Sequence, residues 1–265
     1  MPYIKANGIR IAYDTYGDMK NPPLFMTHGL YGSRRSFDVW AERFSKYFFV
    51  ITYDCRGHGQ SDKPAYFTLS DHGRDLLALI DAFGYEQAAV YGVSMGSYVT
   101  LQAAALDSSK ISRLVLVVTK GYGKTSSFSA KLKEMGIDPY DVPIEQLQGG
   151  TATNEALWCP ETPMEVRELE EKTAPAITSS GAERKAIDTA LLGFDLRPGC
   201  PFVSCPTLIC QGRHDGLNPV EGGQELAELI PNAELRIFEH SGHLVYVEEP
   251  ELLYKTVVEF LCKKD

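Results

Sequence analysis

Short apolar runs alternate with amphipathic stretches along most of the chain. The apolar runs are rich in strand-forming residues, which is typical of strands buried in a parallel sheet. These runs occupy 24–27, 48–53, 88–91, 111–119, 206–211 and 234–238. Between them, apolar residues recur at helical spacing over 37–47, 70–83, 95–106, 222–230 and 250–261. A hairpin is also predicted over 2–16, around Asn7-Gly8. Strands that alternate with helices predict an α/β fold, with a mostly parallel sheet of about eight strands and helices on both faces.

The alternation stops over 120–201. This stretch is richer in Gly, Ser, Thr, Pro and charged residues, and its helical patterns are short; they cover 130–135, 144–147, 163–174 and 181–192. Regular order resumes at Pro206. We therefore interpret 120–201 as an insertion above the sheet, with 1–119 and 202–265 forming one core.

The stretch from Gly92 to Gly96 reads Gly-Val-Ser-Met-Gly and lies between a predicted strand and a predicted helix. In this context G-x-S-x-G places a serine on a sharp turn, and side chains at the two glycine positions would crowd that turn. The turn exposes the Ser94 hydroxyl and leaves the next N–H at a helix N-terminus, where a developing anion is stabilised. The alternative is an ordinary Gly/Ser turn before a helix.

A serine nucleophile needs a base and a group that orients the base, and both follow later strands. Asp215 lies just beyond the predicted strand 206–211, and His243 lies beyond 234–238. The carboxyl ends of parallel strands meet at one edge of a sheet, and the chain order is Ser, Asp, His. These residues therefore predict a triad of Ser94, Asp215 and His243.

Each of these two assignments has a rival. His240 lies three residues before His243, but it abuts the strand, whereas Ser241-Gly242 gives His243 a flexible turn on which to reach back over the sheet. Asp54 also ends a strand, yet it precedes the serine in the chain. We therefore rank His240 and Asp54 second.

The oxyanion of an acyl-transfer intermediate needs two N–H donors. Met95 follows the nucleophile and supplies one of them. The glycine-containing loop after 24–27 supplies the other from Leu30, and His28 is expected to order that loop.

Composition narrows the class of partner. The net charge of −9 and pI near 5.2 argue against nucleic acid or an anionic membrane as a partner. Neither a signal peptide nor a membrane-spanning run is apparent, which predicts a cytoplasmic protein. The six cysteines contain no C-x-x-C pair and predict free thiols, so we expect neither a metal nor a cofactor. The oligomeric state is not predicted.

Taken together, the chain resembles the α/β-hydrolase superfamily, specifically its small, cap-bearing esterase- and lipase-like members. The resemblance covers 24–119 and 206–261, more than half of the chain. It rests on five motifs: HGLYGS at 28–33, DCRGHGQSD at 54–62, GVSMG at 92–96, GRHD at 212–215 and SGH at 241–243.

The resemblance implies the same roles: Ser94 as nucleophile, His243 as base, Asp215 as orienting acid, and Leu30 and Met95 as oxyanion donors. It also implies that 120–201 is a mobile helical cap. Serine at the nucleophile position argues against the aspartate-dependent dehalogenases and epoxide hydrolases of this fold. The residue after the serine and the oxyanion loop do not match prolyl iminopeptidases.

The expected partner is a small-molecule acyl substrate, and the predicted reaction is hydrolysis of a small carboxylic ester, lactone or thioester through an acyl-enzyme. Candidate pocket residues are Tyr31, Tyr122, Trp158 and Val245, although Trp158 could instead form the core of the cap and Tyr122 could pack at a strand end. C–C bond hydrolysis, perhydrolysis and a slow-turnover receptor are alternatives on the same triad.

Two charged features flank these positions. Arg34 and Arg35 could bind a substrate carboxylate, but a solvated helix start is the favoured interpretation. The segment 165–172 (EVRELEEK) is expected to be a solvent-exposed helix face.

Overall fold

The computed structural model describes residues 2–143, 147 and 151–263. Its main sheet has eight strands, which in spatial order are β1 (Tyr3–Ala6), β2 (Ile9–Tyr16), β4 (Phe49–Tyr53), β3 (Pro23–Thr27), β5 (Ala88–Val93), β6 (Ile111–Val117), β9 (Thr207–Gly212) and β10 (Ala233–Phe238). β1 and β2 pair antiparallel, β2 joins β4 antiparallel, and all the later pairings are parallel. The predicted α/β fold with a mostly parallel sheet is confirmed.

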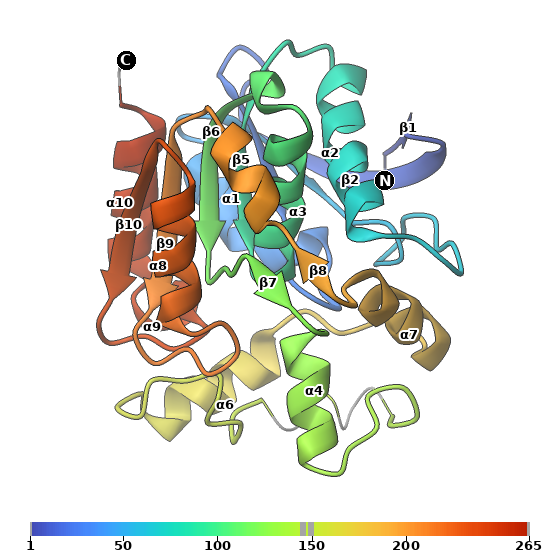
Figure 1. Cartoon of the computed structure of the whole chain (residues 1–265), viewed down its shortest axis with the longest axis vertical. Helices are drawn as coiled ribbons and strands as arrows, with labels where there is room; N and C mark the ends of the chain where they lie inside the picture. The colour runs from blue at the N-terminus through green and yellow to red at the C-terminus, as the bar shows by residue number, and fades with distance from the viewer. Residues whose placement is uncertain (1, 144–146, 148–150, 264–265) are drawn as a thin grey trace.

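Helices cover both faces of the sheet (Figure 1). One face packs against α2 (Leu69–Ala82), α3 (Met95–Leu106) and α8 (Val220–Leu229), and the other against α1 (Asp38–Phe44) and α10 (Pro250–Leu261). The two-residue period of a strand explains how one sequence serves both layers. On β5, for example, Val90 belongs to the α2–α3 side and Tyr91 to the side of α1 and α10. Both side chains are almost fully buried, which is why the strands read as continuous apolar runs.

A capping residue fixes the start of α2, and a short 3₁₀ turn precedes α1. Thr68 caps α2, because its hydroxyl accepts the Asp71 N–H while the Asp71 carboxylate accepts the Thr68 N–H. The predicted helix 37–47 is shorter than expected: a 3₁₀ turn over Arg34–Phe37 precedes α1, which ends at Phe44. Further short elements are η2 (Ser108–Lys110), η3 (Arg197–Phe202) and α9 (Val245–Glu248).

Most of the described part of the segment 120–201 lies beyond the carboxyl ends of the parallel strands, in the lower part of Figure 1. It contains β7 (Tyr122–Gly123) and β8 (Phe194–Asp195), which pair antiparallel, and the helices α4 (Ser127–Glu134), α6 (Met164–Thr173) and α7 (Gly181–Ala190). The sequence did not predict β7 and β8, since two residues give no readable period. The predicted helical patch at 144–147 lies outside the described residues except for Leu147. Within the described chain, no helix is both long and apolar enough to span a membrane.

Candidate active site

Ser94 occupies the turn between β5 and α3. Its backbone has φ 53° and ψ −119°, a conformation that a non-glycine residue adopts only at a cost of about 1–3 kcal/mol. The Ser94 N–H donates to the Val117 carbonyl at 2.9 Å, and the Ser94 carbonyl accepts the Ser97 N–H at 2.9 Å. These backbone bonds to β6 and α3 hold the strained turn in place.

Two glycines make this turn possible. A Cβ on Gly92 would lie 2.3 Å from the Gly96 carbonyl oxygen, and a Cβ on Gly96 would lie 2.1 Å from the Thr27 carbonyl oxygen. Neither distance is compatible with a side chain. Glycine is therefore required at both positions, and its absence would separate α3 from β3 and β5.

His243 lies on the loop that follows β10. Its backbone N–H donates to the Leu157 carbonyl at 2.8 Å, so a residue from 120–201 fixes the loop. The preceding Gly242 N–H donates to a Glu248 carboxylate oxygen at 2.6 Å. A Cβ on Gly212, at the end of β9, would lie 1.9 Å from the Gly242 carbonyl oxygen, so the loop packs directly on the neighbouring strand.

Asp215 follows β9 and is held by its own turn. Its Oδ1 accepts the Leu217 N–H at 2.8 Å and the Asn218 N–H at 2.9 Å. The Asn218 side chain is fixed in turn, because it donates to the Val118 carbonyl at 2.6 Å and accepts from the Tyr98 hydroxyl at 2.7 Å. These contacts leave Oδ2 of Asp215 directed at the histidine. Sequence reasoning missed Asn218 because its role depends on partners far away in the chain.

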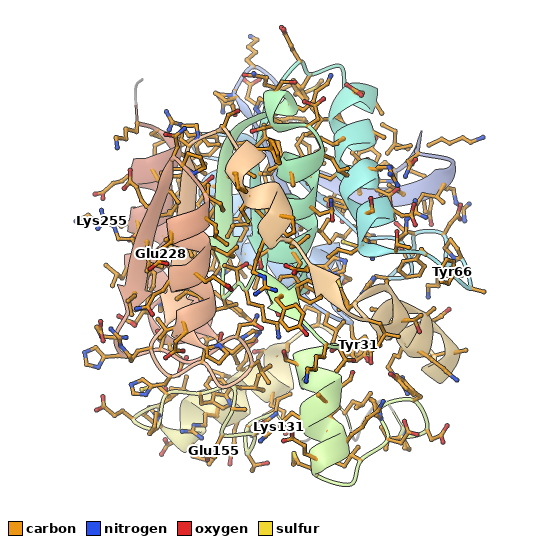
Figure 2. The ribbon with its side chains drawn as sticks, in the orientation of Figure 1. Tyr31, Tyr66, Lys131, Glu155, Glu228 and Lys255 are labelled. Carbon is orange, nitrogen blue, oxygen red and sulfur yellow. The ribbon has the colours of Figure 1, made fainter. Side chains whose placement is uncertain are left out.

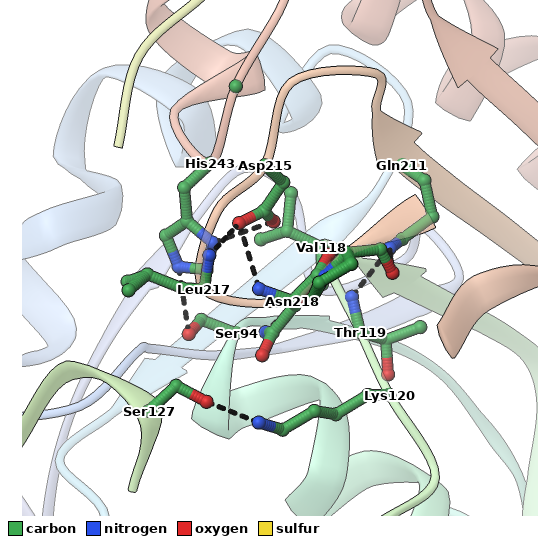
Figure 3. A network of polar contacts seen from close by, with 12 residues as sticks. Ser94, Val118, Thr119, Lys120, Ser127, Gln211, Asp215, Leu217, Asn218 and His243 are labelled. Atoms are coloured by element: carbon green, nitrogen blue, oxygen red, sulfur yellow. Dashed lines mark hydrogen bonds and ion pairs between the residues drawn. The ribbon is translucent and has the colours of Figure 1, made fainter. Parts of the chain in front are cut away.

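The three side chains form one hydrogen-bonded line (Figure 3). The Asp215 Oδ2 lies 2.8 Å from His243 Nδ1, and His243 Nε2 lies 3.0 Å from Ser94 Oγ. An ionised carboxylate only accepts hydrogen bonds, so Nδ1 carries the proton and Nε2 is free to accept from the hydroxyl. The arrangement can therefore remove the Ser94 proton.

The two rival residues lie elsewhere. The His240 side chain is 73% exposed and its Nδ1 faces Glu161 at 3.3 Å. Asp54 is fully buried, where it accepts hydrogen bonds from Arg34 and from the Gln60 N–H.

The loop after β3 passes close to the serine. A Cβ on Gly29 would lie 3.6 Å from the Ser94 Cβ, and the Gly32 N–H closes a turn onto the Gly29 carbonyl at 3.1 Å. His28 orders this loop: its Nε2 accepts the Cys55 N–H at 3.0 Å, so its Nδ1–H donates to the Gly29 carbonyl at 2.8 Å. Burial lowers the pKa of His28 and favours this neutral form. Leu30 lies on the loop at the cavity wall.

Met95 is the first residue of α3 and is buried. The first N–H groups of an α-helix have no acceptor within the helix and carry the positive end of its dipole. The Met95 N–H is thus of the type that can stabilise an anion next to Ser94.

A cavity of about 260 Å³ opens beside Ser94 and His243. The core contributes the loop after β3 together with aromatic side chains, and the segment 120–201 covers the opposite side. Its lining from that segment comprises Phe128, Leu147, Thr151, Leu157, Glu170, Glu171, Ala174, Pro175 and Ile177.

Of the four predicted pocket residues, Tyr31 lines this cavity and the other three do not. Tyr122 is 39% exposed and carries the Arg197 guanidinium over its ring. Trp158 is buried in a small cluster and donates from Nε1 to the Thr151 carbonyl at 2.8 Å. Val245 is fully buried in the core on the α10 side. In the last two cases the preceding residues, Leu157 and Leu244, face the cavity instead.

Tyr31 also joins the core to α4, at the junction labelled in Figure 2. Its hydroxyl lies 2.9 Å from the Ser129 Oγ, and its backbone has φ 57°. The loop next to Leu30 is therefore tied to the segment 120–201.

Two expectations about charged residues are confirmed only in part: the Arg35 side chain is 62% exposed, but Arg34 is not. Arg34 is buried, 4% exposed, and pairs with Asp54 at 2.6 Å and with Asp14 at 2.7 Å instead of standing in solvent. The helix face at 165–172 is not uniformly exposed, because Arg167 is buried and Glu170 faces the cavity. Helical charge periodicity gave no signal for either, since tertiary contacts determine which charges are covered.

The fold and the geometry of this site are typical of hydrolases, and the comparison with known families agrees. The chain belongs to the alpha/beta hydrolase fold family, whose model matches residues 22–250.

Among named relatives, the chain is similar to 3-oxoadipate enol-lactonase 2 of Acinetobacter baylyi, with 28% identity over 98% of this chain and 96% of that protein. Among solved structures, it is similar to the enol-lactonase from Burkholderia xenovorans, with a TM-score of 0.83 and 25% identity over 99% of this chain and 100% of that one. An esterase from Exiguobacterium antarcticum superposes with a TM-score of 0.82 at 25% identity, over 98% of this chain and 99% of that one.

Proposed function

We propose that the protein is a serine hydrolase that cleaves small carboxylic esters or lactones through an acyl-enzyme on Ser94. Its family and its esterase and enol-lactonase relatives make it a hydrolase that acts on ester bonds. The observation that carries the finer proposal is the line from Asp215 through His243 to Ser94, which ends at a cavity.

In the first half-reaction, His243 Nε2 takes the proton of Ser94 as its Oγ attacks the carbonyl carbon. The Leu30 and Met95 N–H groups stabilise the oxyanion, and the loss of one such donor typically costs about 10²–10³ in rate. The C–O bond then breaks, and the His243 Nε2 proton goes to the leaving oxygen. Asp215 stays ionised and stabilises the imidazolium.

In the second half-reaction, water takes the place of the leaving group. His243 removes a proton from this water as its oxygen attacks the acyl carbon, and the same proton returns to Ser94 Oγ when the acid departs. A lactone follows the same path, but its acyl and leaving ends are parts of one product.

The size and composition of the cavity support a small substrate. A volume of about 260 Å³ is at the low end for a ligand pocket, and most of its lining is apolar. The segment 120–201 supplies much of this lining, which supports its proposed role as a cap. The cap and the core would together exclude water from the acyl group.

The decisive test is Ser94→Ala, assayed for steady-state hydrolysis of p-nitrophenyl acetate. We expect turnover to fall by about 10⁴–10⁶. An alanine variant that retains the wild-type rate would refute the mechanism. A single slow turnover of the wild type, with a lasting adduct on Ser94, would instead indicate a receptor. A panel of esters, lactones and thioesters of graded chain length would define the acyl group.

A further inference from the structure

Glu170 places a carboxyl group in the wall of the same cavity as Ser94 and His243. Its neighbour Glu171 is already engaged, because its Oε2 accepts the Ala152 N–H at 2.8 Å and the Thr151 hydroxyl at 3.2 Å. Within the described chain, no hydrogen bond or ion pair reaches the Glu170 carboxyl. It is therefore the acidic group of the wall that is available to a ligand.

The two cations that share α6 with Glu170, Arg167 and Lys172, are engaged by other groups. Arg167 donates to Glu155 and to the carbonyl oxygens of Thr162 and Cys159. On the outer face of the same helix, Lys172 lies 3.5 Å from Glu168.

Two further cations are engaged by other groups. Arg34, in the core, pairs with Asp54 and Asp14. Lys120, at the start of the segment 120–201, donates to the Ser127 hydroxyl and lies close enough to Asp215 for their charges to interact. Among the described residues that line the cavity there is no lysine or arginine. The charged side of the wall is thus acidic.

Glu170 is partly buried, so its carboxylate is less screened by water and interacts more strongly with charges in the cavity. Burial raises the pKa of its carboxyl group, because the ionised form loses hydration there. Tyr246, which also lines the cavity, lies close to this carboxylate. Burial raises the pKa of the Tyr246 phenol, and the negative charge of Glu170 raises it further. A cation in the cavity would restore the lost interactions of the carboxylate, and a second anion would add repulsion.

We propose that Glu170 sets the charge selectivity of the site, favouring acyl chains that carry an ammonium group and disfavouring those that carry a carboxylate. This inference rests on the proposed function, since it takes the cavity beside Ser94 as the acyl pocket.

Three p-nitrophenyl esters of closely similar shape test it: the 4-(trimethylammonio)butyrate, the neutral 5,5-dimethylhexanoate and the glutarate monoester. Their kcat/KM values would be measured at one pH, about 8, for the wild type and every variant. The neutral ester normalises each variant. We expect Glu170→Gln to lower the normalised value for the cationic ester and to raise that for the anionic ester, each by about tenfold.

Glu168→Gln is the matched control, because it removes the same charge from an exposed position on the same helix. It should keep the cation-to-anion ratio within about twofold of the wild type. An equal ratio in the wild type and in Glu170→Gln would overturn the inference. So would a uniform loss on all three esters, which would indicate a structural role.

Failure of the proposed function would look different. If Ser94→Ala hydrolyses the neutral ester as fast as the wild type, the acyl-enzyme mechanism is wrong whatever the charge preference. Calorimetric binding of the three esters to Ser94→Ala gives the charge preference without turnover. Tighter binding of the cationic ester that is lost on adding Glu170→Gln would support the inference, and equal binding of all three would overturn it.

Discussion

Asp215→Asn should lower the rate of hydrolysis while leaving the stability of the fold largely unchanged. The amide oxygen of the new side chain can still accept the Leu217 and Asn218 N–H groups that Asp215 Oδ1 accepts at 2.8 and 2.9 Å. The amide nitrogen then faces His243 Nδ1, where the carboxylate oxygen lies 2.8 Å away. Two donors cannot share this contact, so the imidazole must carry its proton on Nε2. That nitrogen then donates to Ser94 and no longer serves as a base.

The size of the effect follows from the imidazolium formed in the transition state. A unit charge about 4 Å from a carboxylate, at an effective dielectric constant near 20, is stabilised by about 4 kcal/mol, or about 10³ in rate. The wrong tautomer adds to this loss. We therefore expect kcat for p-nitrophenyl acetate to fall by about 10³–10⁴.

Asp54→Asn is the matched comparison, because Asp54 is also an aspartate that follows a strand of the sheet and is fully buried. Its carboxylate pairs with Arg34 Nη1 at 2.6 Å and accepts the Arg34 N–H at 2.7 Å. Breaking this buried pair should lower the free energy of unfolding by about 3–5 kcal/mol. The kcat of the folded variant should remain within about tenfold of the wild type, since Asp54 does not contact His243.

Urea unfolding and initial rates, measured on both variants, show which of the two aspartates orients His243. The reasoning fails if Asp215→Asn keeps its rate within tenfold of the wild type. It also fails if Asp54→Asn loses three orders of magnitude in rate at unchanged stability, which would make Asp54 the orienting acid.

Two further predictions concern stability. Gly96→Ala would set a Cβ 2.1 Å from the Thr27 carbonyl oxygen, and the forced shift should lower the free energy of unfolding by about 1–3 kcal/mol or more; equal melting temperatures would contradict this. Burial lowers the pKa of His72 to about 3 and also lowers the pKa values of His28 and His58, so the unfolded chain binds protons that the native chain does not. The free energy of unfolding should therefore fall as the pH is lowered below about 6.5. His72 alone should account for about 1 kcal/mol between pH 6.5 and 5.5, so urea titrations of His72→Gln should show a shallower fall.

Sequence patterns predicted the fold and its sheet because the information is local. Parallel strands buried on both faces must be apolar throughout, and the run at β5 shows this without any tertiary knowledge. The order of Ser94, Asp215 and His243 placed each residue beyond a strand end, and the structure brings their side chains together. Their catalytic roles remain predictions until variants are measured.

The cavity wall could not be predicted in the same way. Residue type and nearness to the triad in sequence predict Trp158 and Val245 as pocket residues, but the residue before each of them faces the cavity instead. The helix that carries Glu170 buries Arg167 and leaves Leu169 exposed, so the period of its apolar residues does not reveal which side is covered. Such choices depend on how the segment 120–201 packs over the strand ends, which no periodicity encodes.

Strained backbone conformations are concentrated near the candidate active site. Among the described residues, four non-glycine residues have positive φ, and three of them lie just beyond β3, β5 and β6: Tyr31, Ser94 and Val118. A β-branched residue such as Val118, at φ 49°, is a true outlier, and a strained residue costs about 1–3 kcal/mol. Its carbonyl accepts from Asn218, whose own N–H holds Asp215. The strain at Val118 therefore persists because the contact that supports Asp215 also holds the Val118 backbone. Relieving the strain at Val118 would loosen the support of Asp215 rather than simply stabilise the fold.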